Sequence, residues 1–310
     1  MIVTVTLNPA VDEEFVVSDF RPGGWFRSTQ ADRTPGGKGI NVSIMLRQLG
    51  YESTTMGYLA GFNGSYILDS LRRKRITTSF IHVRGETRTN VYIIDGNGNV
   101  GTGLSEPGPD VPEAAQERFM RMYERMLQRA RLIVIGGSLP PGTKTSVYAD
   151  LIRKARALGI PTIIDSAGEP LLEALDAGPT IAKIDHRFMS RMLGVPLNSL
   201  DNIIDVLSTL HKKGIQWAVA SYHVFGNVFF CPDGAFLSMA DRRTSVSLFA
   251  SGDALIAGLI AAREEKMSSL DSIRFAMACA WETTTHFEKG ISSRNAVEDI
   301  FRKVEIEKLS

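Results

Sequence analysis

The chain has 310 residues, 44 % of them hydrophobic, and its 35 basic residues nearly balance 34 acidic ones. A chain of this length can bury a large core, as one α/β domain or one with a small appendage. The formal net charge of +1 argues against a nucleic acid or a membrane surface as partner, so an anionic ligand must be met locally.

Cysteine content and apolar runs narrow the class further. Cys231 and Cys279 form neither a disulfide framework nor a metal-ligand spacing, and we expect buried thiols in a reducing compartment. The first eight residues lack a basic region followed by a long apolar stretch, and no run of 18 apolar residues occurs. We therefore expect a cytoplasmic protein.

Short runs rich in β-branched and aromatic residues alternate with longer amphipathic runs. Strands are predicted at Ile2–Leu7, Leu132–Ile135, Thr162–Asp165 and Trp217–Ser221. Helices are predicted at Ile40–Leu49, Gly64–Arg73, Glu113–Arg129, Lys144–Leu158, Leu200–Lys213, Gly252–Glu265 and Leu270–Phe287. This alternation predicts an α/β fold with a doubly wound, mostly parallel sheet. The loops after Leu7, Gly136, Asp165 and Ser221 should then converge on one cleft beyond the carboxyl ends of the strands.

Two regions, at about 11–35 and 86–110, break the alternation. They contain strand-like runs such as Asn90–Ile94, and the Asp-Gly and Asn-Gly steps at 95–98 are hairpin signals. These segments predict a small antiparallel sheet that acts as a lid over the cleft, with surface hairpins of no covering role as the alternative. We treat residues 1–310 as a single domain that carries this lid.

In Pro35–Val42, three glycines flank Lys38 ahead of a helical pattern. Glycine lets the backbone approach a ligand closely, and the lysine supplies a movable positive charge for phosphate. The spacing is not that of a Walker A loop. A flexible glycine turn that leads into a helix is the competing interpretation.

The stretch Phe249–Gly258 places a carboxylate, Asp253, in the first turn of an apolar helix. Backbone N–H groups at a helix start lack intrahelical partners and can hold an anion, such as a phosphoryl group in transfer. Asp253 could then take a proton from a hydroxyl group. An ordinary N-cap with an aspartate in the first turn is the alternative.

Six motifs, in order and spacing along nearly the whole chain, resemble those of ribokinase-like sugar kinases of the PfkB type, in the branch of 1-phosphofructokinase, tagatose-6-phosphate kinase and minor 6-phosphofructokinase. They are Thr6–Asp12, Pro35–Val42, Thr87–Val91, Gly136–Gly142, Asp165–Glu169 and Ser251–Asp253. The resemblance implies an α/β domain with a β-sheet lid. It also implies that MgATP phosphorylates a hydroxyl of a sugar or sugar phosphate.

The resemblance assigns roles on the acceptor side. Asp12 grips two sugar hydroxyls, Gly37 and Asn41 approach the sugar, and Lys38 meets phosphate charge. Arg88 binds a phosphate already on the acceptor, which suits its forked guanidinium. Two further residues, Asn90 and Ser138, are hydrogen-bonding neighbours of the sugar or cap their own turns. From the lid, Arg27 reaches toward the same phosphate.

For the transfer itself, the resemblance implies that Asp253 is the base and that backbone N–H groups of Ala250, Ser251, Gly252 and Asp253 stabilise the moving phosphoryl group. The nucleotide side is expected to use Lys183, Asp185, Ser221 and Gly226. ATP and Mg²⁺ are the implied cofactors.

The nucleotide side departs from the family pattern. Where the family has Lys-Pro-Asn, two residues and Glu, this chain keeps Lys183 but has Asp185 and Phe188. The Mg²⁺ ligands are then expected from Asp185 and Glu169.

Three further positions depart from the pattern. His223 stands where a glycine takes a positive φ cheaply, unless the turn is rebuilt with the ring facing solvent. Ala250 replaces a glycine, a mild change if its φ is negative. Trp281 and Glu282 occupy a helix where small residues flank adenine, so that Trp281 either narrows the base pocket or packs in the core.

Three functions follow. The first is ATP-dependent phosphorylation of a ketose phosphate to a bisphosphate, with fructose 1-phosphate, fructose 6-phosphate and tagatose 6-phosphate as candidate acceptors. The second is a catalytically impaired homologue that binds a sugar phosphate as a sensor or regulator. The third is an enzyme with another phosphoryl donor or a nucleoside-type acceptor. An apolar face of the lid sheet would favour a homodimer.

Overall fold

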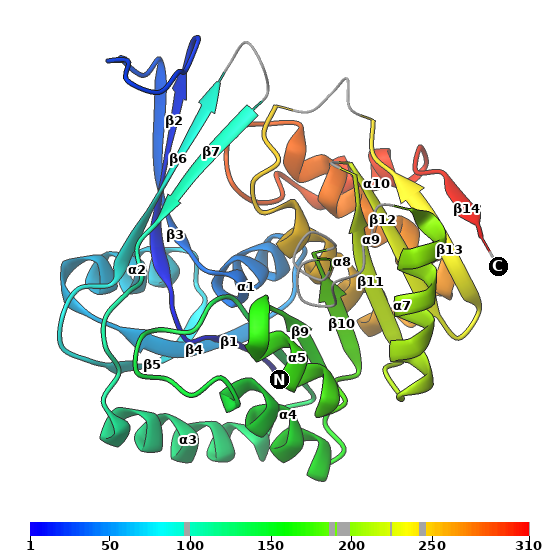
Figure 1. The fold of residues 1–310 in the computed structure, drawn as a ribbon, viewed down its shortest axis with the longest axis horizontal. Helices are drawn as coiled ribbons and strands as arrows, with labels where there is room; N and C mark the ends of the chain where they lie inside the picture. Colours follow the sequence, from blue (N-terminus) through cyan, green and yellow to red (C-terminus); the bar gives the residue numbers. More distant parts are fainter. Residues whose placement is uncertain (96–99, 186–189, 191–198, 224, 242–245, 310) are drawn as a thin grey trace.

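The structure is a computed structural model that describes residues 1–95, 100–185, 190, 199–223, 225–241 and 246–309. Figure 1 shows a large sheet surrounded by helices, with a second, smaller sheet standing to one side of it. The turn predicted at 96–98 and the residues at 186 and 188 lie outside the described residues.

The large sheet has ten strands in the order β14-β13-β12-β11-β10-β9-β8-β1-β4-β5. Their bounds are β1 (Ile2–Thr6), β4 (Ser53–Leu59), β5 (Thr77–His82), β8 (Leu132–Gly136), β9 (Thr162–Asp165), β10 (Ile181–Ile184), β11 (Trp217–Tyr222), β12 (Gly226–Cys231), β13 (Gly234–Met239) and β14 (Ile306–Lys308). Strands β11 through β5 pair in parallel, whereas β12, β13 and β14 add an antiparallel edge. The predicted mostly parallel sheet is confirmed.

Helices cover both faces of this sheet (Figure 1). One layer contains α1 (Lys38–Gln48), α8 (Ser251–Glu264), α9 (Ser269–Thr284) and α10 (Arg294–Phe301). The other contains α3 (Glu113–Leu127), α4 (Val147–Ala157), α5 (Gly168–Asp176) and α7 (Leu200–Lys212). The seven predicted helices agree with the structure to within three residues at each end, whereas the sequence prediction missed α5 and α10.

The buried strands explain the two layers. On β1, Val3 and Val5 pack into the core that includes α3 and α4, and Ile2 packs into the core that includes α8 and α9. Successive side chains of a strand point to opposite faces, so a fully buried strand such as β1 contributes to both helix layers at once. The carboxyl ends of the parallel strands then meet at one edge, as the sequence predicted.

The small sheet has the order β3-β2-β6-β7, from β2 (Ala10–Val17), β3 (Gln30–Gly36), β6 (Arg88–Asp95) and β7 (Val100–Ser105). It consists of the two regions that the sequence set apart. The prediction of a purely antiparallel sheet is wrong, because β2 and β6 pair in parallel. These two strands follow the parallel strands β1 and β5, so both leave the same edge of the large sheet in the same direction.

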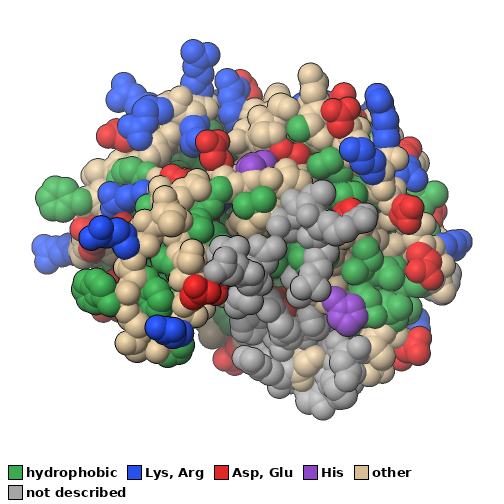
Figure 2. All heavy atoms as spheres, turned by 90° about the horizontal axis from the view of Figure 1, so that it is seen from above, with side chains coloured by type: hydrophobic (Ala, Val, Ile, Leu, Met, Phe, Trp, Pro, Cys, Tyr) green, Lys and Arg blue, Asp and Glu red, His purple; other side chains and the backbone are tan. Residues whose placement is uncertain are grey.

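One further helix, α2 (Gly61–Arg73), packs with α1 and β2 in a third apolar cluster. From above, Figure 2 shows basic and acidic side chains mixed around the rim of the molecule, and hydrophobic side chains at the end that carries the small sheet and α2. None of the helices in the described ranges has the length and apolar character needed to cross a bilayer.

Candidate active site

Asp12 lies on β2 with its side chain 2 % exposed. Asn90 Nδ2, from the neighbouring β6, donates to Asp12 Oδ1 at 2.7 Å. Lys289 Nζ donates to Asp12 Oδ2 and to Pro35 O, each at 2.7 Å. Only glycine fits at position 36, because a Cβ there would lie 2.0 Å from Asp12 Oδ2. The structure therefore fixes the Asp12 carboxylate from three segments of the chain.

Asp253 lies in the first turn of α8 and faces the first turn of α1. Asn41 Nδ2 donates to Asp253 Oδ2 at 2.8 Å, and Lys38 Nζ lies 3.8 Å from Asp253 Oδ1. Burial raises the pKa of Asp253, against the opposing effect of Lys38. Asp253 Oδ1 accepts no hydrogen bond from the described residues. One oxygen of a carboxylate with a raised pKa is thus free to take a proton.

The start of α1 depends on local backbone geometry. Gly37, the residue before the helix, has φ 109°, which a side chain would strain, and a Cβ there would lie 2.5 Å from Thr6 Cγ2. Thr6 Oγ1 accepts from Ile40 N at 3.0 Å. The glycine-rich turn therefore seats α1 directly against the end of β1, which sets Lys38 and Asn41 in front of Asp253.

Asp165, at the end of β9, connects two lysines. Lys38 Nζ donates to its Oδ2 at 3.0 Å, and Lys183 Nζ lies 3.5 Å from the same oxygen. Burial opposes the charge on Asp165, but Lys183 and Lys38 together lower its pKa. Burial also opposes the charge on Lys38, yet Asp165 and Asp253 prevail and raise its pKa. Lys38 and Asp165 are therefore charged at neutral pH.

Arg88 and Ser138 are joined through Asn8, just after β1. Arg88 Nε and Nη2 donate to Asn8 O at 3.3 and 3.2 Å, and Arg88 Nη1 donates to Glu106 O at 3.2 Å. Asn8 Nδ2 donates to Ser138 Oγ at 3.2 Å. Two of the five N–H donors of the Arg88 guanidinium remain for a ligand.

The structure does not bring Arg27 to these residues. Arg27 is exposed and lies beyond the Val16–Gln30 pair, at the far end of the β2–β3 hairpin, whereas Asp12 pairs with Thr34 near its base. Within this chain the strands carry Arg27 away from Asp12, and its reach toward the acceptor phosphate stays a prediction.

A pocket of about 370 Å³ lies at the carboxyl ends of β10 and β11. The predicted nucleotide residues all line it, together with two residues of the α8 start; they are Lys183, Asp185, Ser221, Gly226, Ser251 and Gly252. A Cβ on Gly252 would lie 2.9 Å from Lys183 Nζ. The absence of a side chain at 252 therefore lets the lysine amine lie against the start of α8.

The backbone before α8 differs from the expectation in two respects. Ala250 has φ 59°, in the left-handed region, so its replacement of glycine is not the mild change expected for a negative φ. Asp253 N donates to Ala250 O at 2.9 Å, so this N–H is not available to an anion. The N–H groups of Ala250 and Gly252 have no acceptor among the described residues. These two N–H groups remain the candidates for phosphoryl contact.

His223 also has a positive φ, 51°, where a negative value was expected for a non-glycine residue. Its ring lies tilted against that of Tyr222, with centroids 4.1 Å apart, and His223 lines the 370 Å³ pocket. The histidine thus adopts a positive φ at some conformational cost. It lines the pocket but is exposed, so the alternative of a residue that faces solvent stays open.

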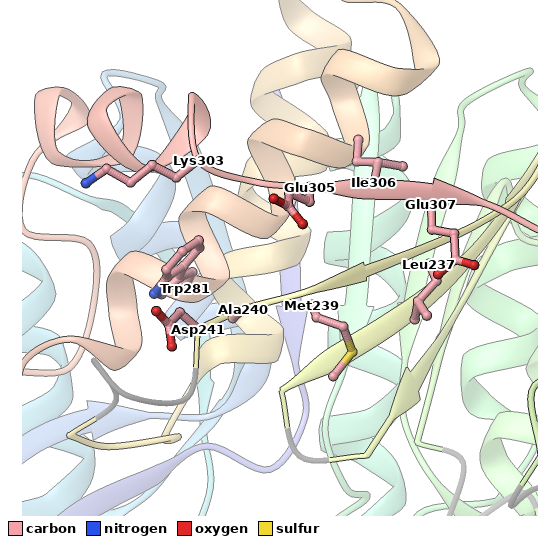
Figure 3. A pocket seen from close by; sticks show the side chains of 9 residues that line it. All are labelled: Leu237, Met239, Ala240, Asp241, Trp281, Lys303, Glu305, Ile306 and Glu307. Atoms are coloured by element: carbon pink, nitrogen blue, oxygen red, sulfur yellow. The ribbon is translucent and has the colours of Figure 1, made fainter.

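The two bulky residues of α9 do not fill that pocket. Ala280 lines it, while Trp281 lines a second pocket of about 440 Å³. Figure 3 shows Trp281 beside Asp241, with Lys303 above it. Glu282 is buried and accepts from Ser292 N at 3.2 Å. The expected narrowing of the base pocket by these side chains is not seen.

The metal prediction finds support in one residue. Asp185 lines the 370 Å³ pocket, whereas Glu169 is exposed in the first turn of α5 and does not line it. Within the ranges that the structure describes, no group of three or more His, Cys, Asp or Glu side chains could hold a metal ion. A metal there would need oxygen ligands from a bound nucleotide.

Sequence reasoning missed two residues of this site. Asp165 lies in one of the family motifs and at the end of a predicted strand. That position could have indicated a site residue, but Asp165 was not predicted as one. Lys289 follows α9 in a loop, 277 residues from Asp12, and no local pattern indicates the pair.

Buried polar atoms without a hydrogen-bond partner gather around Asp12 and Asp253. In the described residues they include both carboxyl oxygens of Glu14, Thr34 Oγ1, Asn41 Oδ1, Asn90 Oδ1 and Asp253 Oδ1. Native structures rarely leave such groups unpaired, and each exception calls for an explanation. A ligand rich in hydroxyl groups would satisfy them together.

Comparisons with known proteins show what this chain is similar to. A family described as "pfkB family carbohydrate kinase" matches residues 7–295. The chain is 28 % identical over 309 residues to a 1-phosphofructokinase of Bacillus subtilis (strain 168), covering 100 % of both chains. It is also 28 % identical over 317 residues to a tagatose-6-phosphate kinase of Staphylococcus epidermidis, covering 99 % of each. A crystal structure of a possible 1-phosphofructokinase from Thermotoga maritima has a TM-score of 0.91 and 31 % identity, with 100 % of both chains covered.

Proposed function

The chain belongs to the pfkB family of carbohydrate kinases, and we propose that it transfers the γ-phosphoryl group of ATP to a hydroxyl of a ketose phosphate, giving a bisphosphate. The cluster of unpaired buried polar atoms around Asp12 and Asp253 is the observation that carries the proposal. A sugar phosphate offers several hydroxyl groups that can donate to these unpaired oxygen atoms. Nothing in the comparisons supports the alternative of a sensor that binds a sugar phosphate without turnover.

On the acceptor side, the proposal gives Asp12 and Asn90 the sugar hydroxyls. Lys38, with its side chain 37 % exposed, and Arg88 with its two free donors, are the cations for phosphate charge. Gly37 and Asn41 shape the wall beneath the sugar, and Ser138 borders it through Asn8. Two cations at one cleft argue for an acceptor that already carries phosphate.

The transfer step uses Asp253 as general base. Asn41 holds Oδ2, and Oδ1 takes the proton of the attacking hydroxyl. The new bond between the acceptor oxygen and the γ-phosphorus forms as the bond from that phosphorus to the β,γ-bridging oxygen breaks, and ADP leaves with the bonding electron pair. The N–H groups of Ala250 and Gly252, with Ser251 in the same turn, and the amine of Lys183 meet the charge on the moving group. Phosphoryl transfer needs little covalent help, so these positioned groups account for most of the catalysis.

ATP would occupy the 370 Å³ pocket, with Ser221 and Gly226 along its wall. Mg²⁺ commonly takes one or two carboxylates, with phosphate oxygens and water completing its shell. Asp185 fits that requirement as a single protein ligand. Asp185 would hold Mg²⁺, which would neutralise phosphate charge, and Lys183 would orient the phosphate chain.

An assay of ADP release with fructose 1-phosphate, fructose 6-phosphate and tagatose 6-phosphate tests the proposal. We expect turnover with at least one of them, and absence of turnover with all three would contradict it. Calorimetric titration with MgATP separates the remaining alternatives: sugar-phosphate binding without MgATP binding indicates the sensor. Turnover with another donor, or with a nucleoside, indicates the third function.

The proposal includes the small sheet as the lid of one domain over 1–310. It is supported by Asp12, which β2 supplies and which is buried on the same sheet face as Glu14. The other face of the sheet carries half-buried Phe15, Val91 and Ile93 beside Leu104, which is 64 % exposed. An apolar sheet face of this kind suits pairing with a second copy. Light scattering on the eluted protein at micromolar concentration should give the mass of a dimer, and a monomer would reject the pairing.

A further inference from the structure

Glu14 is a buried acid that the proposed reaction leaves without a role. It lies on β2, 1 % exposed, and neither of its carboxyl oxygens has a hydrogen-bond partner among the described residues. A buried polar group without a partner is costly, and a buried charge without one more so. At this position the lid sheet therefore buries a carboxyl group that receives no hydrogen bond from the described part of the chain.

Strand geometry puts Glu14 on the face of the small sheet that carries Asp12. Residues two apart on a strand share a face, so Glu14 and Asp12 point to the same side of the small sheet. Glu14 pairs with Tyr92 on β6, and the Tyr92 ring contacts Phe249, with centroids 4.0 Å apart. Phe249 directly precedes Ala250. Glu14 thus lies between Asp12 and the segment that leads to Asp253.

The charged groups that face Glu14 come from three segments. They are Asp12 on its own strand, Asp32 on β3, and Lys289 in the loop after α9. Lys289 is 3 % exposed and uses two of its three N–H donors on Asp12 and Pro35. Burial raises the pKa of Glu14 to about 7, with Lys289 opposing and the two aspartates reinforcing the rise. The group therefore changes charge near neutral pH.

We propose that Glu14 is a specificity-determining acceptor of the sugar subsite, whose carboxylate receives a hydrogen bond from an acceptor hydroxyl beyond those held by Asp12. The inference rests on the proposed function and narrows its substrate class to polyol phosphates with a free hydroxyl on the lid side. An ionised carboxylate only accepts hydrogen bonds, and a hydroxyl donor both satisfies it and stabilises its charged form. Acceptor affinity should then increase as Glu14 ionises.

The test compares Glu14→Gln with Glu13→Gln. Glu13 lies on the opposite face of β2, where it pairs with Arg33 at 3.2 Å, so its change leaves the cleft untouched. We expect Glu14→Gln to raise the KM for the accepted ketose phosphate about 10-fold at pH 8, the lower end for a hydrogen bond to a charged group. kcat and the KM for ATP should change less than about 3-fold by the same reasoning.

The pH profile supplies a readout that a merely structural role would not move. Between pH 6.5 and 8.5 the phosphate of the substrate is mostly ionised already, because its second pKa lies near about 6. Over this range the KM of the wild-type protein should fall as pH rises through about 7, and the fall should be absent in Glu14→Gln. Glu14→Asp, which retains the charge on a shorter side chain, should keep the pH dependence with a smaller rise in KM.

Two results overturn the inference: an unchanged KM in Glu14→Gln at every pH, or a wild-type KM that does not vary over this range. The pH dependence of the wild-type KM needs no variant, so this measurement still tests the inference if Glu14→Gln fails to fold. Failure of the proposed function looks different, because wild-type protein would then release no ADP with any ketose phosphate. In that case calorimetric binding of the same three sugar phosphates to the wild-type protein and Glu14→Gln decides, with equal affinities counting against a role for Glu14.

Discussion

The acceptor half and the nucleotide half of this cleft contain different kinds of unfavourable structure: unpaired buried polar groups in the first, and strained backbone conformations in the second. Around Asp12 and Asp253, glycines occupy the positions where a side chain would clash or strain the backbone. Several buried carboxylate and amide oxygens there have no hydrogen-bond partner among the described residues. Around the nucleotide pocket, two non-glycine residues, His223 and Ala250, hold left-handed backbone conformations. The first half concentrates charge for a polar substrate, and the second retains a family backbone with unfavourable residues.

The comparison suggests which changes should damage function and which should improve stability. Removal of a charged group from the acceptor half should reduce turnover where the group takes part in the reaction. Elsewhere it should change the free energy of unfolding. Glycine at a strained position of the nucleotide half should leave the chemistry in place. Four substitutions test this division, from the largest expected effect to the smallest.

Asp253→Asn should reduce kcat by about 10²–10⁴-fold, since the amide cannot take the proton of the acceptor hydroxyl. Steady-state ADP release measures the change. Asn41 Nδ2 can still donate to the amide oxygen, so folding and calorimetric sugar-phosphate binding should persist. A folded variant with full turnover would remove Asp253 from the role of base.

Asp165→Asn should lower the free energy of unfolding by about 2–3 kcal/mol, because Lys38 and Lys183 lose their shared counter-charge. The value is set below that of a fully buried pair, since Lys38 is partly exposed. Urea denaturation at pH 7 measures it. The control, Glu124→Gln, removes the exposed partner of Lys154 at 2.7 Å and should cost less than about 1 kcal/mol. Equal losses in the two variants would show that the Asp165 cluster is no stronger than a surface pair.

Glu14→Gln should stabilise the fold at alkaline pH. The pKa of Glu14 is raised from an ordinary value of 4.5 to about 7, so the folded state binds the proton more tightly than the unfolded state does. Its contribution to stability is complete below pH 4.5 and is lost as pH rises to about 7. Urea denaturation should show little difference from the wild-type protein near pH 4.5 and a gain of about 2–3 kcal/mol at pH 8. A gain that does not vary with pH would contradict the raised pKa.

Ala250→Gly should stabilise the protein by about 0.5–1 kcal/mol, because glycine adopts φ 59° without a Cβ penalty and is the better residue before a helix. Thermal unfolding monitored by circular dichroism measures the gain, with kcat expected within about 2-fold of the wild-type value. Ala254→Gly, inside the same helix, is the matched control and should destabilise by a similar amount. A loss of stability in Ala250→Gly would mean that the alanine methyl packs usefully despite its backbone.

The sequence predicted most of what depends on neighbouring residues. Strand alternation and helix periodicity identified the layers, and the two glycine-containing helix starts identified Lys38 and Asp253. Asn41 was assigned through the family resemblance alone. The antiparallel strands β12 to β14 and the short helices α5 and α10 escaped prediction, because short elements carry few repeats of a period. The parallel pairing of β2 with β6 escaped it for another reason: a hairpin signal says nothing about a partner some 80 residues away.

Contacts between distant segments were decided by the tertiary structure alone. Lys289 reaches Asp12 and Asp165 holds two lysines because the carboxyl ends of parallel strands gather residues that are far apart in the chain. The sign of φ at His223 and Ala250, and the orientation of Trp281 away from the nucleotide pocket, follow from the same packing. Local preferences cost or gain about 1 kcal/mol per residue, and the packing of a core this large overrides them.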